Sequence, residues 1–468
     1  MPQKGFVMKK QRSSFTGQIG FVLAAAGSAV GLGNIWRFPY LAAQCGGGIF
    51  LLVYIILAVT FGFALMLAEV AIGRKTRLSS IGAYGKLDRR FSPLGLVGSA
   101  VPAIIVPYYC VIGGWVTKYF FEFARGRCHE IAADADGYFD GFITASARFL
   151  DNPMPWFLIF LLLTAICVLA GVDKGIEKVS TFLMPVLVVL SIVVAFFSVT
   201  RPGALEGVKY YLLPDFSHFS AMTVLAAMGQ LFYSMSIAMG IMITYGSYMK
   251  KEDDLERSIG QIELFDTAIA FLAGLMIIPA VFAFSGGDES ALGKGPGLMF
   301  VTLPRVFADM ELGGLIGTLF FLLVLFAALT SAISLLETVV SIVDDKAHWG
   351  RQRSTIAVTV FVFALGSLSC YGYGSGIIGA IRPFGMAFLD FFDFLSNSVI
   401  MPIVAFFTCI LIGWVTGTNI VSDEVELSGP FRRKRLFELM IKWIAPICLV
   451  AVLVSSVLEN LGYLRYGR

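Results

Sequence analysis

Two apolar stretches of the chain are each interrupted near the middle by glycine and polar residues, and these interruptions have the chemistry to bind a solute. One runs from Gly27 to Asn34 and the other from Ser234 to Gly240. Unwound backbone carbonyls, an amide oxygen and hydroxyls form a hard oxygen shell that suits a small cation such as Na⁺. The amino ends of half-helices present N–H groups and a positive dipole to a carboxylate. This combination predicts a site for an amino-acid zwitterion together with sodium.

The elements that position these residues must lie in a lipid bilayer. Of the 468 residues, 57% are hydrophobic and 14% are charged, whereas soluble domains are about a quarter charged. Runs of roughly 18 or more apolar residues are long enough to cross about 30 Å of hydrocarbon. We predict an all-α polytopic membrane protein with about eleven spanning helices. Their centres are near Val30, Ile56, Val111, Leu162, Val189, Ser236, Leu275, Leu325, Val362, Met401 and Leu449.

The two interruptions lie five spans apart, which indicates an internal repeat. Irregular backbone at membrane depth is tolerated only where it lines a cavity, because unpaired amides and carbonyls are costly in lipid. Breaks at matching places in two five-span units are typical of transporters built from inverted repeats. We therefore divide residues 1–468, one membrane domain, into a first repeat over 15–200, a second over 219–418 and an additional helix over 435–460. Close helix packing through small residues is the alternative interpretation of either stretch alone.

Lysine and arginine gather in alternate loops, and this pattern predicts the orientation. The positive segments are the amino terminus and the loops after spans 2, 6, 8 and 10, and positive residues near span ends stay in the cytoplasm. We expect a multi-pass protein of the inner (plasma) membrane with a cytoplasmic amino terminus and, from the odd span count, an extracellular carboxyl terminus. The longest outer loops are expected to carry short surface helices: 125–152, 201–218 and 286–311.

The sequence has no pattern typical of an enzyme. Its three histidines, His129, His218 and His348, are predicted in loops, and neither a nucleophile and base pair nor a nucleotide-binding loop is present. The net charge of +3 is small and spread over short loops, which excludes a nucleic-acid footprint. The seven cysteines form no CxxC pair, and most are expected to be buried thiols.

The ten residues from Gly31 to Tyr40, which read GLGNIWRFPY, are the most specific motif in the chain. Together with the order of the other motifs across spans 1 to 10, they resemble bacterial members of the neurotransmitter:sodium symporter family, which have the leucine-transporter fold. The resemblance implies uptake of an amino acid by alternating access, driven by sodium ions at two sites. The other expected partner is the bilayer, and the oligomeric state is left open.

Residue by residue, the resemblance implies which groups hold the two ions. Chloride-dependent relatives balance charge with a bound anion and a serine where this chain has Ala270, and the family usually has asparagine where this chain has Asp266. The extra carboxylate therefore implies transport without chloride. The first site would use the Ala29 carbonyl with the side chains of Asn34, Ser234 and Asp266. The second would use the carbonyls of Gly27, Val30 and Ala327 and the hydroxyls of Thr330 and Ser331.

Both sodium assignments have plain alternatives. Asp266 lies early enough in its span to reach the cytoplasmic side by snorkelling. Thr330 and Ser331 would otherwise bond back to carbonyls of their own helix, as buried hydroxyls often do.

The substrate pocket implied by the resemblance is apolar. Tyr109 would donate its hydroxyl to the substrate carboxylate, and Tyr233 would close over the ligand. Monoamine carriers have aspartate where this chain has Gly31, so room is left for the ligand's own carboxylate. A charged side chain would be stranded in a low dielectric, which favours neutral aliphatic or aromatic L-amino acids. The expected lining residues are Ser28, Ala29, Gly31, Gly33, Ile105, Tyr109, Tyr233, Ser234, Ser236, Ala238, Met239, Ser331 and Leu335.

Charged pairs on either side of the pocket match the gates of the family. Arg37 and Asp393 would form the outer gate, and Arg12 and Asp345 the inner gate. Phe15 stands where the family often has tryptophan, which leaves the inner plug aromatic.

Four further residues have weaker assignments or none. Glu69 would brace the unwound backbone, and Gly175 with Pro185 would allow the inner part of span 5 to loosen. Glu337 lies in an apolar stretch and has no role that the sequence assigns.

Two other functions stay open at this stage. In a proton-coupled carrier of the same fold, Asp266 or Glu69 would carry H⁺. A transporter-like receptor would bind the amino acid without moving it. Uptake in sodium-free buffer separates the first of these from a sodium symporter, and accumulation in sealed vesicles separates the second.

Overall fold

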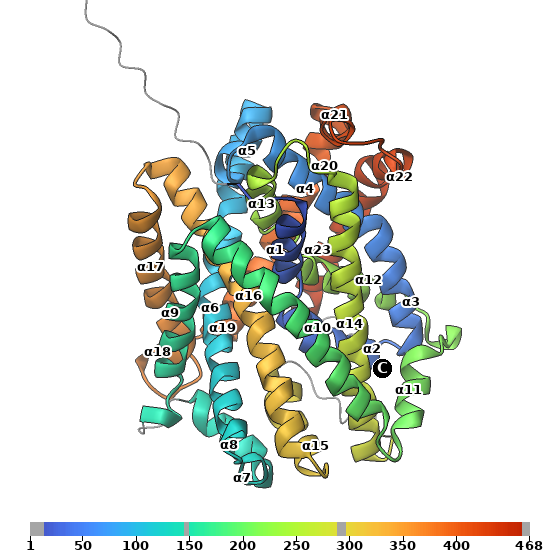
Figure 1. Ribbon diagram of the computed structural model, residues 1–468, viewed down its shortest axis with the longest axis vertical. Helices are drawn as coiled ribbons and strands as arrows, with labels where there is room; N and C mark the ends of the chain where they lie inside the picture. Colours follow the sequence, from blue (N-terminus) through green and yellow to red (C-terminus); the bar gives the residue numbers. More distant parts are fainter. Residues whose placement is uncertain (1–13, 145–148, 288–295, 461–468) are drawn as a thin grey trace, which may run out of the picture.

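The computed structural model describes residues 14–144, 149–287 and 296–460, which form a bundle of helices (Figure 1). Within these ranges, β pairing is confined to one isolated bridge between Gly47 and Pro214. The all-α membrane fold predicted from composition is therefore confirmed.

The first predicted span is broken. The helix α1 (Gln18–Ala29) ends at Val30, whose φ and ψ of −74° and 100° are extended. The chain resumes as η1 (Gly33–Arg37) and α2 (Phe38–Gln44), and the two halves of the span are bent by 51°. Some backbone groups at this bend are therefore released from the helical ladder and contact other helices, among them the Val30 carbonyl and the Leu32 N–H.

The sixth predicted span is broken in the same way. The helix α12 (Ala221–Ser234) and the helix α13 (Ile241–Tyr248) are separated by six irregular residues. Ser236, Ala238 and Gly240 have left-handed backbone, with φ of 53°, 61° and 71°. This conformation costs a residue with a side chain about 1–2 kcal/mol. The two breaks that the glycine pattern predicts are thus confirmed.

The other predicted spans are helices that surround these two. Among the described residues, eight helices are long and apolar enough to cross a membrane, and the bent pair that begins with α1 makes a ninth. The helix α9 and the halves α12 and α13 are shorter, so the total of eleven stays a prediction. The bounds are α3 (Gly48–Leu57), η2 (Ala58–Gly62), α4 (Phe63–Thr76), α6 (Ser92–Ala124), α9 (Pro153–Leu169), η5 (Val172–Glu177), α10 (Lys178–Val199), α14 (Leu255–Ser285), α16 (Gly313–Ala347), α17 (Arg351–Tyr371), α19 (Phe388–Asp393), η10 (Phe394–Ile400), α20 (Met401–Ile410), η11 (Leu411–Val415), α22 (Lys434–Leu439), η12 (Met440–Ile444) and α23 (Ala445–Asn460).

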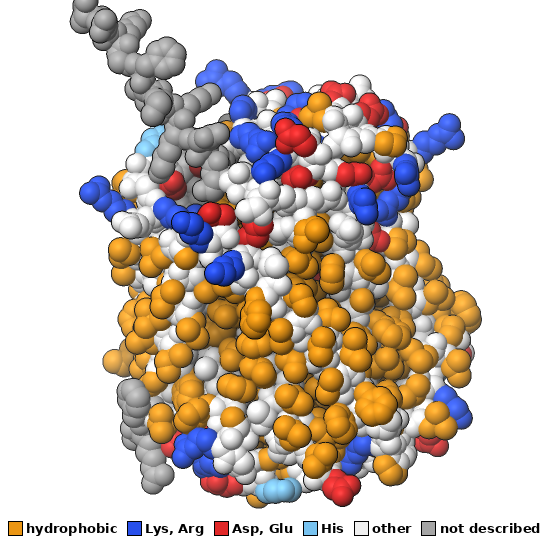
Figure 2. Space-filling view, in the orientation of Figure 1, with side chains coloured by type: hydrophobic (Ala, Val, Ile, Leu, Met, Phe, Trp, Pro, Cys, Tyr) orange, Lys and Arg blue, Asp and Glu red, His pale blue; other side chains and the backbone are white. Residues whose placement is uncertain are grey.

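Short helices cover the two ends of the bundle, and charge gathers there. On the face drawn in Figure 2, apolar side chains form a band across the middle, and Lys and Arg are most frequent at the end that carries α5, α21 and α22. The loops predicted to be outer carry short helices, as expected, at the other end. The short helices are α5 (Ser80–Leu87), α7 (Cys128–Ala133), α8 (Ala135–Ile143), α11 (Ala204–Leu212), α15 (Leu303–Ala308), α18 (Ile377–Ala380) and α21 (Asn419–Glu426).

Glycine holds the half-helix α13 against α4. A Cβ added to Gly73 would lie 1.9 Å from the Ile243 carbonyl oxygen, and one added to Gly246 would lie 2.3 Å from the Val70 carbonyl oxygen. The two backbones therefore touch directly, and a methyl group at either position would separate them. This contact fixes one side of the break in span 6.

Candidate functional site

Asn34, Ser234 and Asp266 form one hydrogen-bonded cluster at the breaks. Nδ2 of Asn34 donates to the Ser234 hydroxyl and to Oδ1 of Asp266, both at 2.8 Å. The Ser234 hydroxyl donates to the same carboxylate oxygen at 2.7 Å. The Asp266 side chain is 0% exposed. The alternative in which Asp266 snorkels to the membrane surface is therefore wrong.

Tyr54 of α3 also belongs to this cluster and was not predicted. Its hydroxyl donates to Oδ2 of Asp266 at 3.0 Å and lies 3.2 Å from the Ser234 hydroxyl oxygen. The available signal was a tyrosine in the middle of an apolar span, because a buried tyrosine hydroxyl usually finds a partner. Both carboxylate oxygens of Asp266 consequently accept hydrogen bonds.

The cluster supplies oxygen ligands suited to an alkali cation. It offers a carboxylate, a serine hydroxyl, a tyrosine hydroxyl and the Asn34 amide, whose oxygen accepts the Gly31 N–H at 3.1 Å. The described part of the chain contains no group of three His, Cys, Asp or Glu side chains placed to hold a metal. Hard oxygen donors with a single carboxylate favour Na⁺ over a transition metal, and the Asn34 amide would turn its oxygen toward such an ion.

A second oxygen cluster joins α16 to the bend in span 1. The Ser331 hydroxyl oxygen lies 3.0 Å from the Ser28 carbonyl oxygen and 3.3 Å from those of Gly27 and Val30. The Thr330 hydroxyl donates to the Ala327 carbonyl at 3.1 Å. The back-bonding alternative therefore holds for Thr330 but not for Ser331.

The two elements of this second cluster are in close contact. A Cβ added to Gly27 would lie 3.2 Å from the Cβ of Thr330. All five residues predicted for the second sodium site are thus brought together by the bend.

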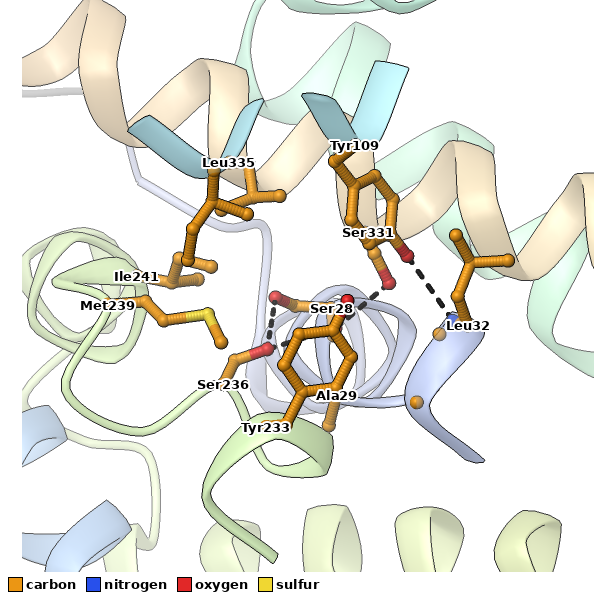
Figure 3. Close-up of a pocket in the computed structure, with 13 residues that line it drawn as sticks. Ser28, Ala29, Leu32, Tyr109, Tyr233, Ser236, Met239, Ile241, Ser331 and Leu335 are labelled. Atoms are coloured by element: carbon orange, nitrogen blue, oxygen red, sulfur yellow. Dashed lines mark hydrogen bonds between the residues drawn. The ribbon is translucent and has the colours of Figure 1, made fainter. Parts of the chain in front are cut away.

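A small cavity lies beside both clusters (Figure 3). Its volume of about 20 Å³ is room for about one water molecule, so the predicted amino acid would enter only when lining side chains shift. Eleven of the predicted substrate contacts line it, and Leu32 and Ile241 line it without having been predicted. Ser234 instead belongs to the first cluster, and Ala238 lies outside the wall. The lining residues are Ser28, Ala29, Gly31, Leu32, Gly33, Ile105, Tyr109, Tyr233, Ser236, Met239, Ile241, Ser331 and Leu335.

The cavity has polar groups on one side and apolar side chains on another. The Tyr109 hydroxyl oxygen accepts the Leu32 N–H at 3.3 Å, at the start of the second half of span 1. The Ser236 hydroxyl donates to the Ser28 carbonyl at 3.0 Å and so joins the two breaks. Figure 3 shows Met239, Ile241 and Leu335 together on another side. The cavity can therefore take a ligand with a charged backbone end and an apolar side chain.

Residues 12–128 and 146–467 match the family model described as the sodium:neurotransmitter symporter family. The chain belongs to this family. The sodium-dependent transporter YhdH of Bacillus subtilis is 34% identical over 94% of this chain and 96% of its own length. A sodium-dependent transporter of Haemophilus influenzae is 31% identical over 96% of this chain and 98% of its own.

A solved structure extends the comparison to the fold. The crystal structure of MhsT in complex with L-phenylalanine matches with a TM-score of 0.85 and 38% identity, over 95% of this chain and 100% of that one. The symporter is therefore a multi-pass, sodium-coupled secondary transporter and not an enzyme, as predicted.

The predicted outer gate of the symporter lies over the cavity. The Arg37 guanidinium is 5.5 Å from the centre of the Tyr233 ring, a cation–π contact. Asp393 accepts a hydrogen bond from the Tyr108 hydroxyl at 3.1 Å and another from the Asn397 amide. Arg37 therefore contacts the predicted aromatic lid, and Asp393 contacts Tyr108, the neighbour in sequence of the cavity residue Tyr109.

Aromatic side chains pack around Phe15, in the predicted inner plug. The Phe15 ring packs edge-on against Phe21, Tyr245 and Tyr248, with ring centroids 5.7, 5.6 and 6.2 Å apart. Asp345 accepts the Ser79 N–H at 2.7 Å. The other predicted member of the inner gate, Arg12, lies outside the described residues.

Glu69 and Glu337 are both buried, and both contact span 6. Glu69 accepts the Ala238 N–H at 2.7 Å, within the break, which agrees with the predicted brace. Glu337 pairs with Arg351 at 2.7 Å and accepts the Tyr248 hydroxyl at 2.8 Å. The sequence showed the charge of Glu337 but not this partner.

Proposed function

We propose that this symporter moves a neutral, apolar L-amino acid, aliphatic or aromatic, into the cell together with sodium and without chloride. The observation that carries the proposal is the cavity at the two breaks, whose thirteen lining residues include no charged side chain. The substrate carboxylate would lie at the amino end of the second half of span 1, near the Tyr109 hydroxyl. The likeness to MhsT, whose structure contains L-phenylalanine, supports the same choice.

Two sodium sites follow from the two oxygen clusters. The first would use Ala29, Asn34, Ser234 and Asp266, and the second Gly27, Val30, Ala327, Thr330 and Ser331. Bound sodium would supply the positive charge that allows the substrate carboxylate to sit beside Asp266. Because Asp266 already provides a fixed negative charge, no chloride is needed to balance the ions.

The transport cycle we propose is alternating access around this fixed site. The repeats over 15–200 and 219–418 would rock against each other, with the Arg37 and Asp393 gate on the outside and the Phe15 plug on the inside. The amino terminus would be cytoplasmic and the carboxyl terminus extracellular. A transmembrane potential of 100 mV contributes about 2.3 kcal/mol for each sodium ion moved inward.

Uptake into proteoliposomes tests the function. Labelled phenylalanine and leucine should accumulate when sodium is high outside, and labelled lysine and glutamate should not. A proton gradient in sodium-free buffer should drive no uptake. Uptake with protons alone would support the proton-coupled carrier, and binding without accumulation would support the receptor.

A side chain at position 31 should weaken substrate binding. A Cβ added to Gly31 would lie 2.6 Å from the Ser331 hydroxyl oxygen and 2.9 Å from the Tyr109 hydroxyl oxygen. Overpacking of this kind costs about 1–3 kcal/mol, so Gly31→Ala should weaken phenylalanine binding by roughly five- to 150-fold. The matched control is Gly229→Ala, whose Cβ meets no atom within 4 Å. Equal affinities of the two variants would place the substrate elsewhere.

The hydroxyl of Tyr109 should strengthen substrate binding by donating a hydrogen bond to the charged substrate carboxylate. Tyr109→Phe keeps the ring and removes only the hydroxyl, so binding should weaken by about 1.5–3 kcal/mol. Scintillation proximity binding at saturating sodium measures this directly. Wild-type affinity in Tyr109→Phe would rule out the carboxylate contact while leaving the pocket itself in place.

A further inference from the structure

A buried carboxylate from span 5 holds the start of α1, and the transport site makes no use of it. Glu177 is the last residue of η5 and is 7% exposed. Its Oε2 accepts the Thr16 N–H at 2.9 Å, and its Oε1 accepts the Thr16 hydroxyl. A Cβ added to Gly20 would lie 2.0 Å from Oε1, so the carboxylate runs along the first turn of α1.

The start of α1 depends on partners from other elements. Its N-cap residue, Gly17, has no side chain to cap the helix, and a carboxylate beside the positive end of a helix is stabilising. On the other side, Lys250 donates to the Thr16 carbonyl at 2.6 Å and the Phe15 N–H donates to the Tyr248 carbonyl at 3.2 Å. Glu177 is therefore the tie to span 5, and the other contacts tie α1 to the inner half of span 6.

The segment that carries Glu177 departs from a regular α-helix. The residues of η5 form a π-helix, a wide turn that occurs mostly in short pieces and frequently at functional sites. It begins after Gly171, whose φ is 104°, and Gly175 lies so close to the Cys167 carbonyl that a Cβ would be 2.0 Å away. Pro185 removes a further hydrogen bond within α10. Unwinding of η5 would carry its last residue, Glu177, away from Thr16.

Water has access to this contact from a cleft beside it. The cleft has a volume of about 530 Å³ and is lined by Thr16, Asp173, Lys174, Glu177, Lys178, Thr181 and Phe182. Groups that separate here exchange their hydrogen bonds for bonds to water, so separation is reversible. A fully dry ion pair would not separate as readily.

We propose that Glu177 is a positioning residue of the transport cycle, a latch that keeps α1 against span 5 while the inner side is closed. When η5 unwinds, the latch releases Thr16. The loosening of span 5 is therefore coupled to the movement of α1 away from it. This proposal rests on the proposed function, because it assigns the latch to the inward-opening step.

A buried reporter cysteine measures the latch without substrate. Ser334→Cys is close to isosteric, and Ser334 is 1% exposed behind the aromatic plug, where it accepts the Tyr245 hydroxyl at 2.8 Å. Inside-out vesicles in potassium buffer are treated with a membrane-impermeant thiol reagent. The same proteins without Ser334→Cys give the labelling due to native cysteines.

The variants distinguish loss of the contact between Glu177 and Thr16 from a general destabilisation of the closed inner side. Glu177→Ala should raise the reporter labelling rate by about tenfold or more, the effect of losing a hydrogen bond to a charged group. Thr16→Val should give a smaller rise, and it should add nothing in the Glu177→Ala background, because the two groups act as a pair. The control is Asp173→Asn, which changes another carboxylate of the same cleft and should label as the wild type does. Thermal unfolding in detergent verifies that each variant is folded.

Two results would overturn the latch. One is a Glu177→Ala reporter that labels no faster than the Asp173→Asn reporter. The other is a Thr16→Val effect of equal size with and without Glu177. If Glu177→Ala fails to fold, Thr16→Val compared with the Asp173→Asn control decides in the same way. Failure of the proposed function would show itself separately, as absence of sodium-driven accumulation by the wild type.

Discussion

Replacing Arg351 by leucine should destabilise the symporter by about 3–5 kcal/mol, because the change removes the guanidinium that balances a buried carboxylate. Glu337 is 0% exposed, and its two oxygens accept from Nη1 and Nη2 of Arg351 at 3.2 and 2.7 Å. The same guanidinium donates to the Val168 carbonyl at the end of α9. Arg351→Leu therefore removes the charge pairing and a tie between three helices at once.

Thermal unfolding in detergent measures this effect. Arg351→Leu should melt several degrees below the wild type, and the double variant Glu337→Met with Arg351→Met should recover most of the loss, because two apolar side chains leave no unpaired charge. The control is Lys434→Leu, which breaks the exposed pair between Lys434 and Glu426 at 3.2 Å, where a loss of at most about 1 kcal/mol is expected. If Arg351→Leu and Lys434→Leu melt alike, the buried pair does not stabilise the fold.

The sequence predicts the breaks in spans 1 and 6 because their cause is local. Glycine and small hydroxyl residues at membrane depth are a feature of the residues themselves. The structure adds what no local pattern shows, since Ser236 and Ala238 have left-handed backbone although neither is glycine. That conformation turns Ser236 toward Ser28 and sets Ile241 in the cavity wall, which sequence reasoning missed.

Contacts between distant spans were the part that could not be predicted from the sequence. The sequence shows that Asp266 is charged, but how deeply its side chain is buried depends on how α14 packs against α12 and η1. Tyr54 comes from a third element, 212 residues away from Asp266. Arg351 reaches Glu337 only because α17 begins beside α16. In each case the sequence shows one partner as a charged residue within an apolar span. The other partner is set by how the helices pack.

Replacing Asp266 by asparagine should raise the sodium concentration needed for half-maximal phenylalanine binding by at least about thirtyfold. The carboxylate is fully buried and would face the ion directly, and removal of one partner of such a pair costs about 2–5 kcal/mol or more. Asparagine keeps the shape and can still accept from Ser234. The expected loss is therefore mainly that of the charge.

The same variant should acquire a response to chloride. With Asp266 neutral, the positive charge of bound sodium is balanced only by the substrate, so a small anion near Tyr54 would become stabilising. Phenylalanine binding by Asp266→Asn should rise when gluconate is replaced by chloride, and wild-type binding should not change. Tyr54→Phe is the matched control, since it removes the bond to Oδ2 of Asp266 but keeps the charge; it should weaken sodium binding modestly and stay indifferent to chloride. Indifference of Asp266→Asn itself would show that the carboxylate does not take the place of an anion.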